Sequence, residues 1–130
     1  MILVDSSIWI DYFQGRDTLQ VEILDRSLGV RDVGVGDLVL TEVLQGFRDD
    51  KDYRVAKSIM DELSVFDMLE KGMALKSAEN FRKLRKKGIT IRKTAEVIIA
   101  TYCIEHRLPL LFSDKDFKPF VRHLKLAEVR

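Results

Sequence analysis

Acidic side chains directly follow two apolar stretches of the sequence. Asp5 comes after the run 1–4, and Asp114 and Asp116 come shortly after the run 108–112. If both runs are strands of one parallel sheet, their carboxyl ends meet at the edge where such sheets bind ligands. The three carboxylates then lie close together. Converging carboxylates can hold a divalent cation or perform acid–base chemistry.

Two further carboxylates lie among apolar residues. Glu42 shares a predicted helix face with Leu38 and Val39, which precede it by four and three residues. Glu96 is followed at once by the apolar stretch 97–100. A carboxylate on an apolar face must be paired, protonated or bound to a cation, because burying its bare charge is costly.

Each of these acids also has a purely structural explanation. Asp5 suits a helix N-cap, and Glu96 suits the first turn of a helix. Glu42 would pair with a buried arginine, and Asp114 and Asp116 would be turn residues. Four elements would then deliver acids to one edge by coincidence, so we favour a shared site. Because neither histidine has metal-ligand spacing, the carboxylates predict Mg²⁺ or Mn²⁺ rather than Zn²⁺.

The elements that must position these residues alternate between short apolar strands and amphipathic helices. Strands are expected at 1–4, 32–36, 65–68 and 108–112 and near 129, and helices at 6–14, 18–28, 37–46, 53–63, 70–87, 94–107 and 117–124. This alternation predicts an α/β fold with a parallel central sheet and helices on both faces. The length of 130 residues predicts one domain, 1–130.

Composition narrows the class of protein. The chain is 46% hydrophobic and 33% charged, which predicts a soluble globular protein and excludes disorder throughout. One cysteine, Cys103, forms no internal disulfide and points to a reducing compartment. The longest uncharged apolar stretch, 97–104, is too short for a membrane span, and Asp5 interrupts the apolar start that a signal peptide would need. We therefore expect a cytoplasmic protein with no membrane partner.

Charge is unevenly distributed along the chain. Residues 1–65 carry a net charge of −6 and residues 66–130 a net charge of +7. The stretch Arg82–Lys93, called the basic strip below, holds seven Lys or Arg and no acid. It is either a solvated helix face with its loop or a surface for a polyanion. The overall charge of +1 suits a basic rim beside an acidic pocket better than a pure nucleic-acid binder.

Four stretches together resemble the signature blocks of PIN-domain ribonucleases, in particular the VapC-type toxins of toxin–antitoxin pairs. The stretches are 2–10, 37–46, 92–100 and 111–117. They occur in the family's order and span nearly the whole chain. The resemblance implies a three-layer PIN-like α/β fold and Mg²⁺- or Mn²⁺-dependent endonucleolytic cleavage of RNA.

The resemblance also implies roles for individual residues. The family's acids correspond to Asp5, Glu42, Glu96 and Asp114, with Asp116 as a frequent accessory. In this interpretation Asp5, Glu96 and Asp114 hold the metal, and Glu42 orients or deprotonates the attacking water. The 3′ oxygen then leaves, and the product carries a 5′-phosphate. The small polar residue that helps to place metal or phosphate corresponds to Ser7, and Arg92 is a candidate for positioning the substrate.

One residue departs from the family's pattern, and it keeps alternatives open. Glu96 stands where the family usually has aspartate, so its carboxylate lies about one C–C bond further out, and Mg²⁺ tolerates little distortion. Coordination through water, weaker or Mn²⁺-preferring activity, and an inactive RNA-binding module are all consistent with this change. A receiver- or phosphatase-type domain fits worse, because two serines follow Asp5 and the Asp114–Asp116 pair follows a late strand.

Partners follow mainly from the resemblance. It implies an RNA substrate, a cognate antitoxin and a homodimer. The residues add one feature, the spacing of Trp9, Ile10 and Phe13 in the first predicted helix. These side chains either form an exposed apolar groove for a partner or pack on the sheet, and we favour packing for each taken singly.

Overall fold

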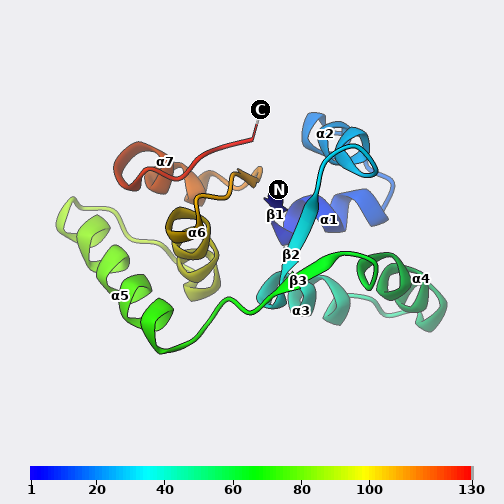
Figure 1. The fold of residues 1–130 in the computed structure, drawn as a ribbon, viewed down its shortest axis with the longest axis horizontal. Helices are drawn as coiled ribbons and strands as arrows, with labels where there is room; N and C mark the ends of the chain where they lie inside the picture. Colours follow the sequence, from blue (N-terminus) through cyan, green and yellow to red (C-terminus); the bar gives the residue numbers. More distant parts are fainter. Residues whose placement is uncertain (130) are drawn as a thin grey trace.

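Strands and helices alternate along the chain in the computed structural model, which describes residues 1–129 (Figure 1). The strands are β1 (Ile2–Val4), β2 (Val33–Gly36), β3 (Ser64–Phe66) and β4 (Leu110–Leu111). The α-helices are α1 (Ser6–Phe13), α2 (Leu19–Ser27), α3 (Asp37–Gln45), α4 (Asp50–Met60), α5 (Lys71–Lys86), α6 (Thr94–His106) and α7 (Lys118–Leu124). A 3₁₀ turn, η1 (Lys115–Phe117), precedes α7.

The four strands form one parallel sheet in the order β3-β2-β1-β4. Figure 1 shows α1 to α4 on one side of this sheet and α5 to α7 on the other. The expected α/β fold with helices on both faces is confirmed. Strand β1 lies between β2 and β4, with Val4 opposite Leu111, and the Asp5 N–H donates to the Leu111 carbonyl at 2.9 Å. The carboxyl ends of β1 and β4 therefore meet.

Several boundaries differ from the sequence prediction. Strand β4 covers only Leu110–Leu111 of the expected 108–112, and most helix ends shift by a residue or a few. Helix α4 begins three residues earlier than expected, because the Asp49 carboxylate caps it by accepting from the Asp52 N–H at 3.0 Å. Strand β3 stops before Met68, whose N–H donates to the Asp37 side chain at 3.1 Å. The last strand expected near residue 129 is wrong, since only a single bridge joins Glu128 to β4.

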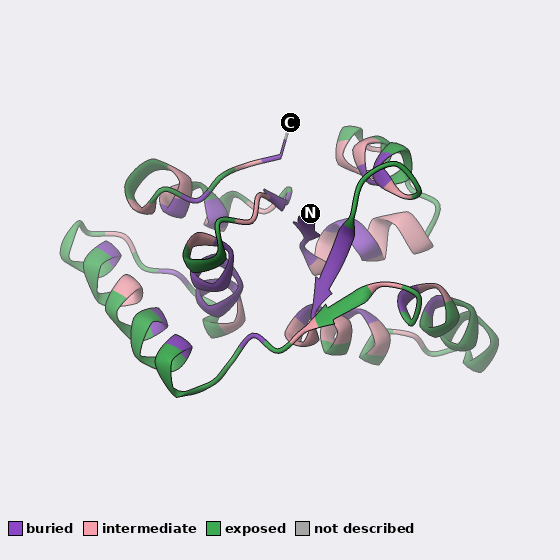
Figure 2. Ribbon diagram, viewed as in Figure 1, coloured by how far each residue is buried: buried purple, intermediate pink, exposed green. Residues whose placement is uncertain are grey.

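Helix α6 is the buried centre of the fold (Figure 2). Its residues 96–103 are all buried, between the sheet side and α5. An apolar sequence on every face predicts such a helix, and each large side chain that it buries contributes about 1.5–3 kcal/mol. Trp9 is fully buried as well, whereas Ile10 and Phe13 are only partly buried. The packing that we favoured therefore holds for Trp9.

Gly36 joins β2 directly to α3, and its missing side chain matters. A Cβ at this position would collide with the side chain of Met68, which is fully buried. The observed position of the Met68 side chain therefore requires glycine at this position. Within residues 1–129, none of the helices is long and apolar enough to cross a membrane.

Candidate metal centre

Two chain segments bring acids to the carboxyl edge of the sheet. Asp5 directly follows β1, and Asp114 lies between β4 and η1. Asp5 occupies the N-cap position of α1, yet its side chain makes no capping hydrogen bond. The backbone N–H groups of Ser6 and Ser7 nevertheless lower its pKa, so the start of α1 stabilises the Asp5 carboxylate without capping it in the usual way. Both carboxylates occupy the edge where ligand sites of parallel sheets lie.

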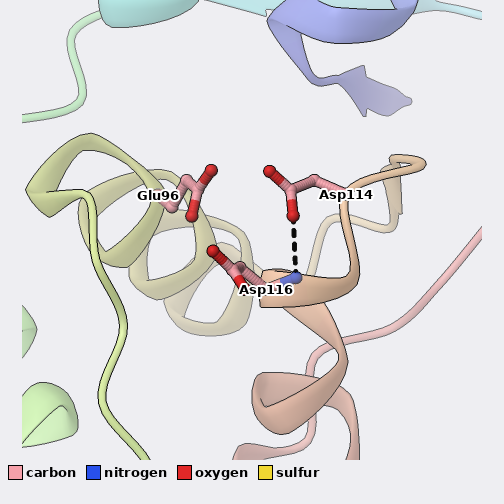
Figure 3. A group of neighbouring side chains, drawn as sticks. All are labelled: Glu96, Asp114 and Asp116. Carbon is pink, nitrogen blue, oxygen red and sulfur yellow. Dashed lines mark hydrogen bonds between the residues drawn. The ribbon is translucent and has the colours of Figure 1, made fainter.

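Glu96, Asp114 and Asp116 form the tightest group of acids (Figure 3). Each offers a carboxylate oxygen, and these oxygens all lie within 4.8 Å of one another. The Asp116 N–H donates to Asp114 Oδ1 at 2.9 Å, so the first turn of η1 fixes the spacing of these two side chains. The extra methylene of Glu96 does not remove its carboxylate from the group. We call these three residues the acidic cluster.

Asp5 is buried beside this cluster, with 5% of its surface exposed. Ser7 Oγ donates to Asp5 Oδ2 at 2.9 Å and lies 3.4 Å from Ser113 Oγ. Burial raises the pKa of Asp5, the hydrogen bond from Ser7 opposes that rise, and the negative charge of Asp114 adds to it. Asp5 is therefore coupled electrostatically to the cluster, although it is not one of the three acids that approach most closely. Sequence reasoning missed Ser113, whose only signal is its position after β4.

Glu96 is the most perturbed of these acids. It is buried on the first turn of α6, and its Oε2 atom has no hydrogen-bond partner among the described residues. Burial, a hydrogen bond that the protonated form shares with Asp114, and the negative charges of Asp114, Asp116 and Asp5 together raise the pKa of Glu96 to about 7. At this position the carboxyl group must keep a proton or gain a cation.

Glu42 approaches the site from α3, on the other side of the sheet. It is half-buried, and its Oε1 atom has no hydrogen-bond partner within residues 1–129. Burial and the charge of Asp5 raise the pKa of Glu42, and the positive charge of Lys93 opposes that rise. The described residues contain no arginine paired with Glu42, so a buried ion pair does not explain it.

Arg92 connects the basic strip to the acidic cluster. Its Nη2 atom lies 3.4 Å from Asp116 Oδ2, and 77% of the Arg92 side chain is exposed. Such an exposed pair contributes little to stability, about 0–1 kcal/mol. The guanidinium group therefore remains available to an anionic ligand at the mouth of the site.

The residues fit a hard divalent cation. The donors of the acidic cluster are carboxylate oxygens alone, which suits Mg²⁺ or Mn²⁺ and not a metal that prefers nitrogen or sulfur. The unpartnered buried oxygen of Glu96 is the atom whose burial a cation would compensate. Like charges gathered at one edge also give a cation a favourable potential there.

Comparisons with known proteins show the family of the chain. Residues 2–121 match the PIN domain family. Ribonuclease VapC11 of Mycobacterium tuberculosis and VapC ribonuclease Mb1587 of Mycobacterium bovis are each 25% identical to the chain over 134 aligned residues, which cover 100% of this chain and of theirs.

Solved structures share the fold. VapBC2 of Rickettsia felis, bound to a DNA fragment from its promoter, superposes with a TM-score of 0.78 at 18% identity, covering 99% of this chain and 98% of that chain. DNA-bound VapBC of Salmonella typhimurium superposes with a TM-score of 0.76 at 16% identity, with the same two coverages of 99% and 98%. The resemblance expected from the four sequence blocks is confirmed by the family match: the chain belongs to the PIN domain family.

Proposed function

We propose that this protein is a metal-dependent endoribonuclease and the toxin of a toxin–antitoxin pair. The observation that carries the proposal is the acidic cluster with Asp5 and Glu42 beside it, at the edge where a parallel sheet binds ligands. The full-length likeness to VapC ribonucleases supports it. The lone, buried cysteine supports a cytoplasmic site of action.

Asp5, Glu96 and Asp114 are the residues that would hold the metal, with Asp116 as a further ligand. A divalent ion supplies electrostatic stabilisation of the negative charge that develops on the phosphoryl group. Ser7 and Ser113 orient this group of ligands, because the Ser7 hydroxyl donates to Asp5 and neighbours that of Ser113. We leave Mg²⁺ and Mn²⁺ as the two candidates, since carboxylate oxygens suit both.

Glu42 is the candidate general base. Its unpartnered Oε1 atom is able to accept a proton from the attacking water. A general base works best when its pKa lies near the working pH, and burial raises the pKa of Glu42 towards that range. The attack displaces the 3′ oxygen of the phosphodiester and leaves a 5′-phosphate. Because this hydrolysis does not use the ribose 2′-OH, preference for RNA must come from binding.

The basic strip, Arg82–Lys93, is the candidate surface for the RNA backbone. Its arginines and lysines are exposed, and Arg92 approaches the acidic cluster through Asp116. The positive charge of Lys93 lowers the pKa of Glu42, so the strip ends close to the site itself. The basic strip would bind phosphates of the RNA backbone and so hold the RNA next to the acidic site, whose negative charge alone would repel it.

Cleavage of a structured RNA by the purified protein tests the enzymatic proposal. We expect cleavage with Mg²⁺ or Mn²⁺, none with a chelator, and products that carry a 5′-phosphate. Glu105→Gln is the control variant, because Glu105 lies on α6 but pairs with Lys76 at the surface. Cleavage that continues in chelator, or an Asp5→Asn variant that still cleaves, would contradict the proposal.

An antitoxin and a second copy of the chain are the proposed protein partners. Ile10, Phe13, Val43 and Phe47 line a hollow of about 250 Å³ between α1 and α3, which offers an apolar groove for a peptide segment. We expect the antitoxin to bind there and to suppress cleavage, and Phe13→Glu to weaken that binding. Sedimentation should give twice the 15.0 kDa chain mass if the homodimer forms.

A further inference from the structure

A cavity of about 440 Å³ lies between α5 and α6, apart from the acidic cluster. Ala78 and Phe81 line it from α5, and Val97 and Ile98 line it from α6. Its walls are almost entirely apolar, and its size falls in the range typical of small-ligand sites. The proposed chemistry of cleavage makes no use of it.

The cavity offers an aromatic ring and few polar groups. Phe81 contributes the ring, and the guanidinium carbon of Arg85 lies 5.4 Å from its centroid. Ser77 also lines the cavity, and its buried hydroxyl has no hydrogen-bond partner among residues 1–129. A flat ligand would stack on the ring, and the exposed residues Arg82 and Thr94, which also line the cavity, would meet its polar edge. Nucleobases have this combination of a π-face and hydrogen-bonding edges.

The position of the cavity links it to the basic strip. Arg82, the first residue of the strip, lines the cavity, and Arg92, near its other end, pairs with Asp116 of the acidic cluster. Thr94 lines the cavity as well, whereas Glu96, two residues later, points into the acidic cluster from a different side of α6. A polyanion that follows the strip therefore passes from the cavity, around the start of α6, to the acids.

We propose that this cavity binds one unstacked nucleobase of the RNA substrate and so contributes to sequence preference. The bound base would lie one or a few nucleotides from the bond that is cleaved. The proposal rests on the proposed ribonuclease function. Proteins read single-stranded RNA by stacking splayed bases on aromatic side chains while basic residues hold the phosphates.

Charge favours RNA over a second copy of the chain at this surface. Arg82 lines the cavity and Arg85 lies over the ring of Phe81; both are exposed, and neither forms a salt bridge within the described residues. A two-fold interface centred on the cavity would bring two such basic faces together, which costs free energy. A polyanion would neutralise them instead.

Binding of short RNA in the presence of a chelator tests the proposal without cleavage. The probe is a fluorescent single-stranded oligoribonucleotide, compared with copies in which one nucleotide at a time is abasic. Ala78→Phe fills the cavity, and Leu75→Phe is the matched control, because Leu75 is exposed on the same helix and does not line the cavity. We expect Ala78→Phe to weaken binding roughly tenfold, the effect of losing one stacked base, and the control to leave it unchanged.

A second, milder variant keeps the proposal testable if Ala78→Phe disturbs folding. Phe81→Leu keeps an apolar side chain and removes the ring, so it should weaken binding of the intact RNA several-fold. Phe81→Leu should not further weaken binding of the RNA that is abasic at the position whose base stacks in the cavity. Equal losses for intact and abasic RNA, or no loss in either variant, would overturn the proposal.

The outcomes separate this inference from the proposed function. Unchanged RNA binding in both variants, together with metal-dependent cleavage by the unmodified chain, overturns the base pocket alone. RNA degraded in chelator overturns the proposed function. Conversion of a dimer to a monomer by Ala78→Phe, seen by sedimentation, assigns the cavity to an interface between copies and also overturns the base pocket.

Discussion

Replacing Glu96 by glutamine should stabilise the metal-free protein at high pH. Glu96 has a pKa of about 7 in the folded chain, against an ordinary value of 4.5. The folded state therefore holds this proton more tightly than the unfolded state, and Glu96 lowers the stability of the fold as pH rises between these two values. Below that window the proton is present in both states, and the penalty disappears.

The magnitude follows from the size of the shift. A rise from 4.5 to about 7 corresponds to roughly 3 kcal/mol between the two protonation states. Solvent at the mouth of the site screens part of this, so we expect glutamine to relieve about 1–2 kcal/mol at pH 8 and less than about 0.5 kcal/mol at pH 5, near the lower end of the window. For a chain of 130 residues this is a rise in Tm of several degrees.

Urea denaturation of both proteins in chelator, at pH 5 and at pH 8, measures the difference. Glu105→Gln is the control, because it removes a carboxylate of α6 whose oxygen lies 2.6 Å from Lys76 Nζ at the surface. It should change the free energy of unfolding by less than about 1 kcal/mol and show no gain at pH 8 over pH 5. Added Mn²⁺ should raise the Tm of the unmodified protein and raise that of Glu96→Gln less. A Glu96→Gln variant that is less stable at both pH values would refute the reasoning.

Three further predictions concern other parts of the site and fold. Asp5→Asn should abolish RNA cleavage and reduce the Mn²⁺ shift in Tm while leaving the metal-free protein at least as stable, because it removes a buried charge; lower stability with intact cleavage would contradict this. Gly36→Ala should lower the free energy of unfolding by about 1–3 kcal/mol, measured in urea, because its Cβ meets Met68. Arg92→Ala should change stability by less than about 1 kcal/mol, since its pair with Asp116 is exposed, yet weaken RNA binding and lower its salt dependence by about one unit in log–log slope.

Much of the site was predictable because it depends on short-range patterns. Apolar runs followed by acids predicted that the ends of β1 and β4 would deliver Asp5 and Asp114 to one edge. The apolar surroundings of Glu42 and Glu96 marked both as unusual, and both are coupled to the site electrostatically. Such patterns reflect local burial, which the sequence records directly.

The remaining features depend on contacts between distant residues or on the geometry of one turn. Sequence patterns do not predict that Asp116, rather than Asp5, joins Glu96 and Asp114 in the acidic cluster. The hydrogen bond from the Asp116 N–H to Asp114 decides that spacing. The end of β3 depends on Asp37, which takes the N–H of Met68 from 31 positions away. Neither the spacing of apolar residues nor their propensities contain this information.

The burial of α6 has a consequence for how the chain could lose activity. In native proteins, amide groups in the best-packed elements exchange their hydrogens only through the largest unfolding events, while exposed elements open locally. Residues 96–103 of α6 are all buried, whereas most of α5 and the strip that follows it is exposed. Mild heat or denaturant should therefore unfold α5 and the basic strip locally, and open the cavity beside them, while α6 stays folded and keeps Glu96 in place. A partly opened molecule would keep its cation ligands and lose its hold on the nucleic acid first.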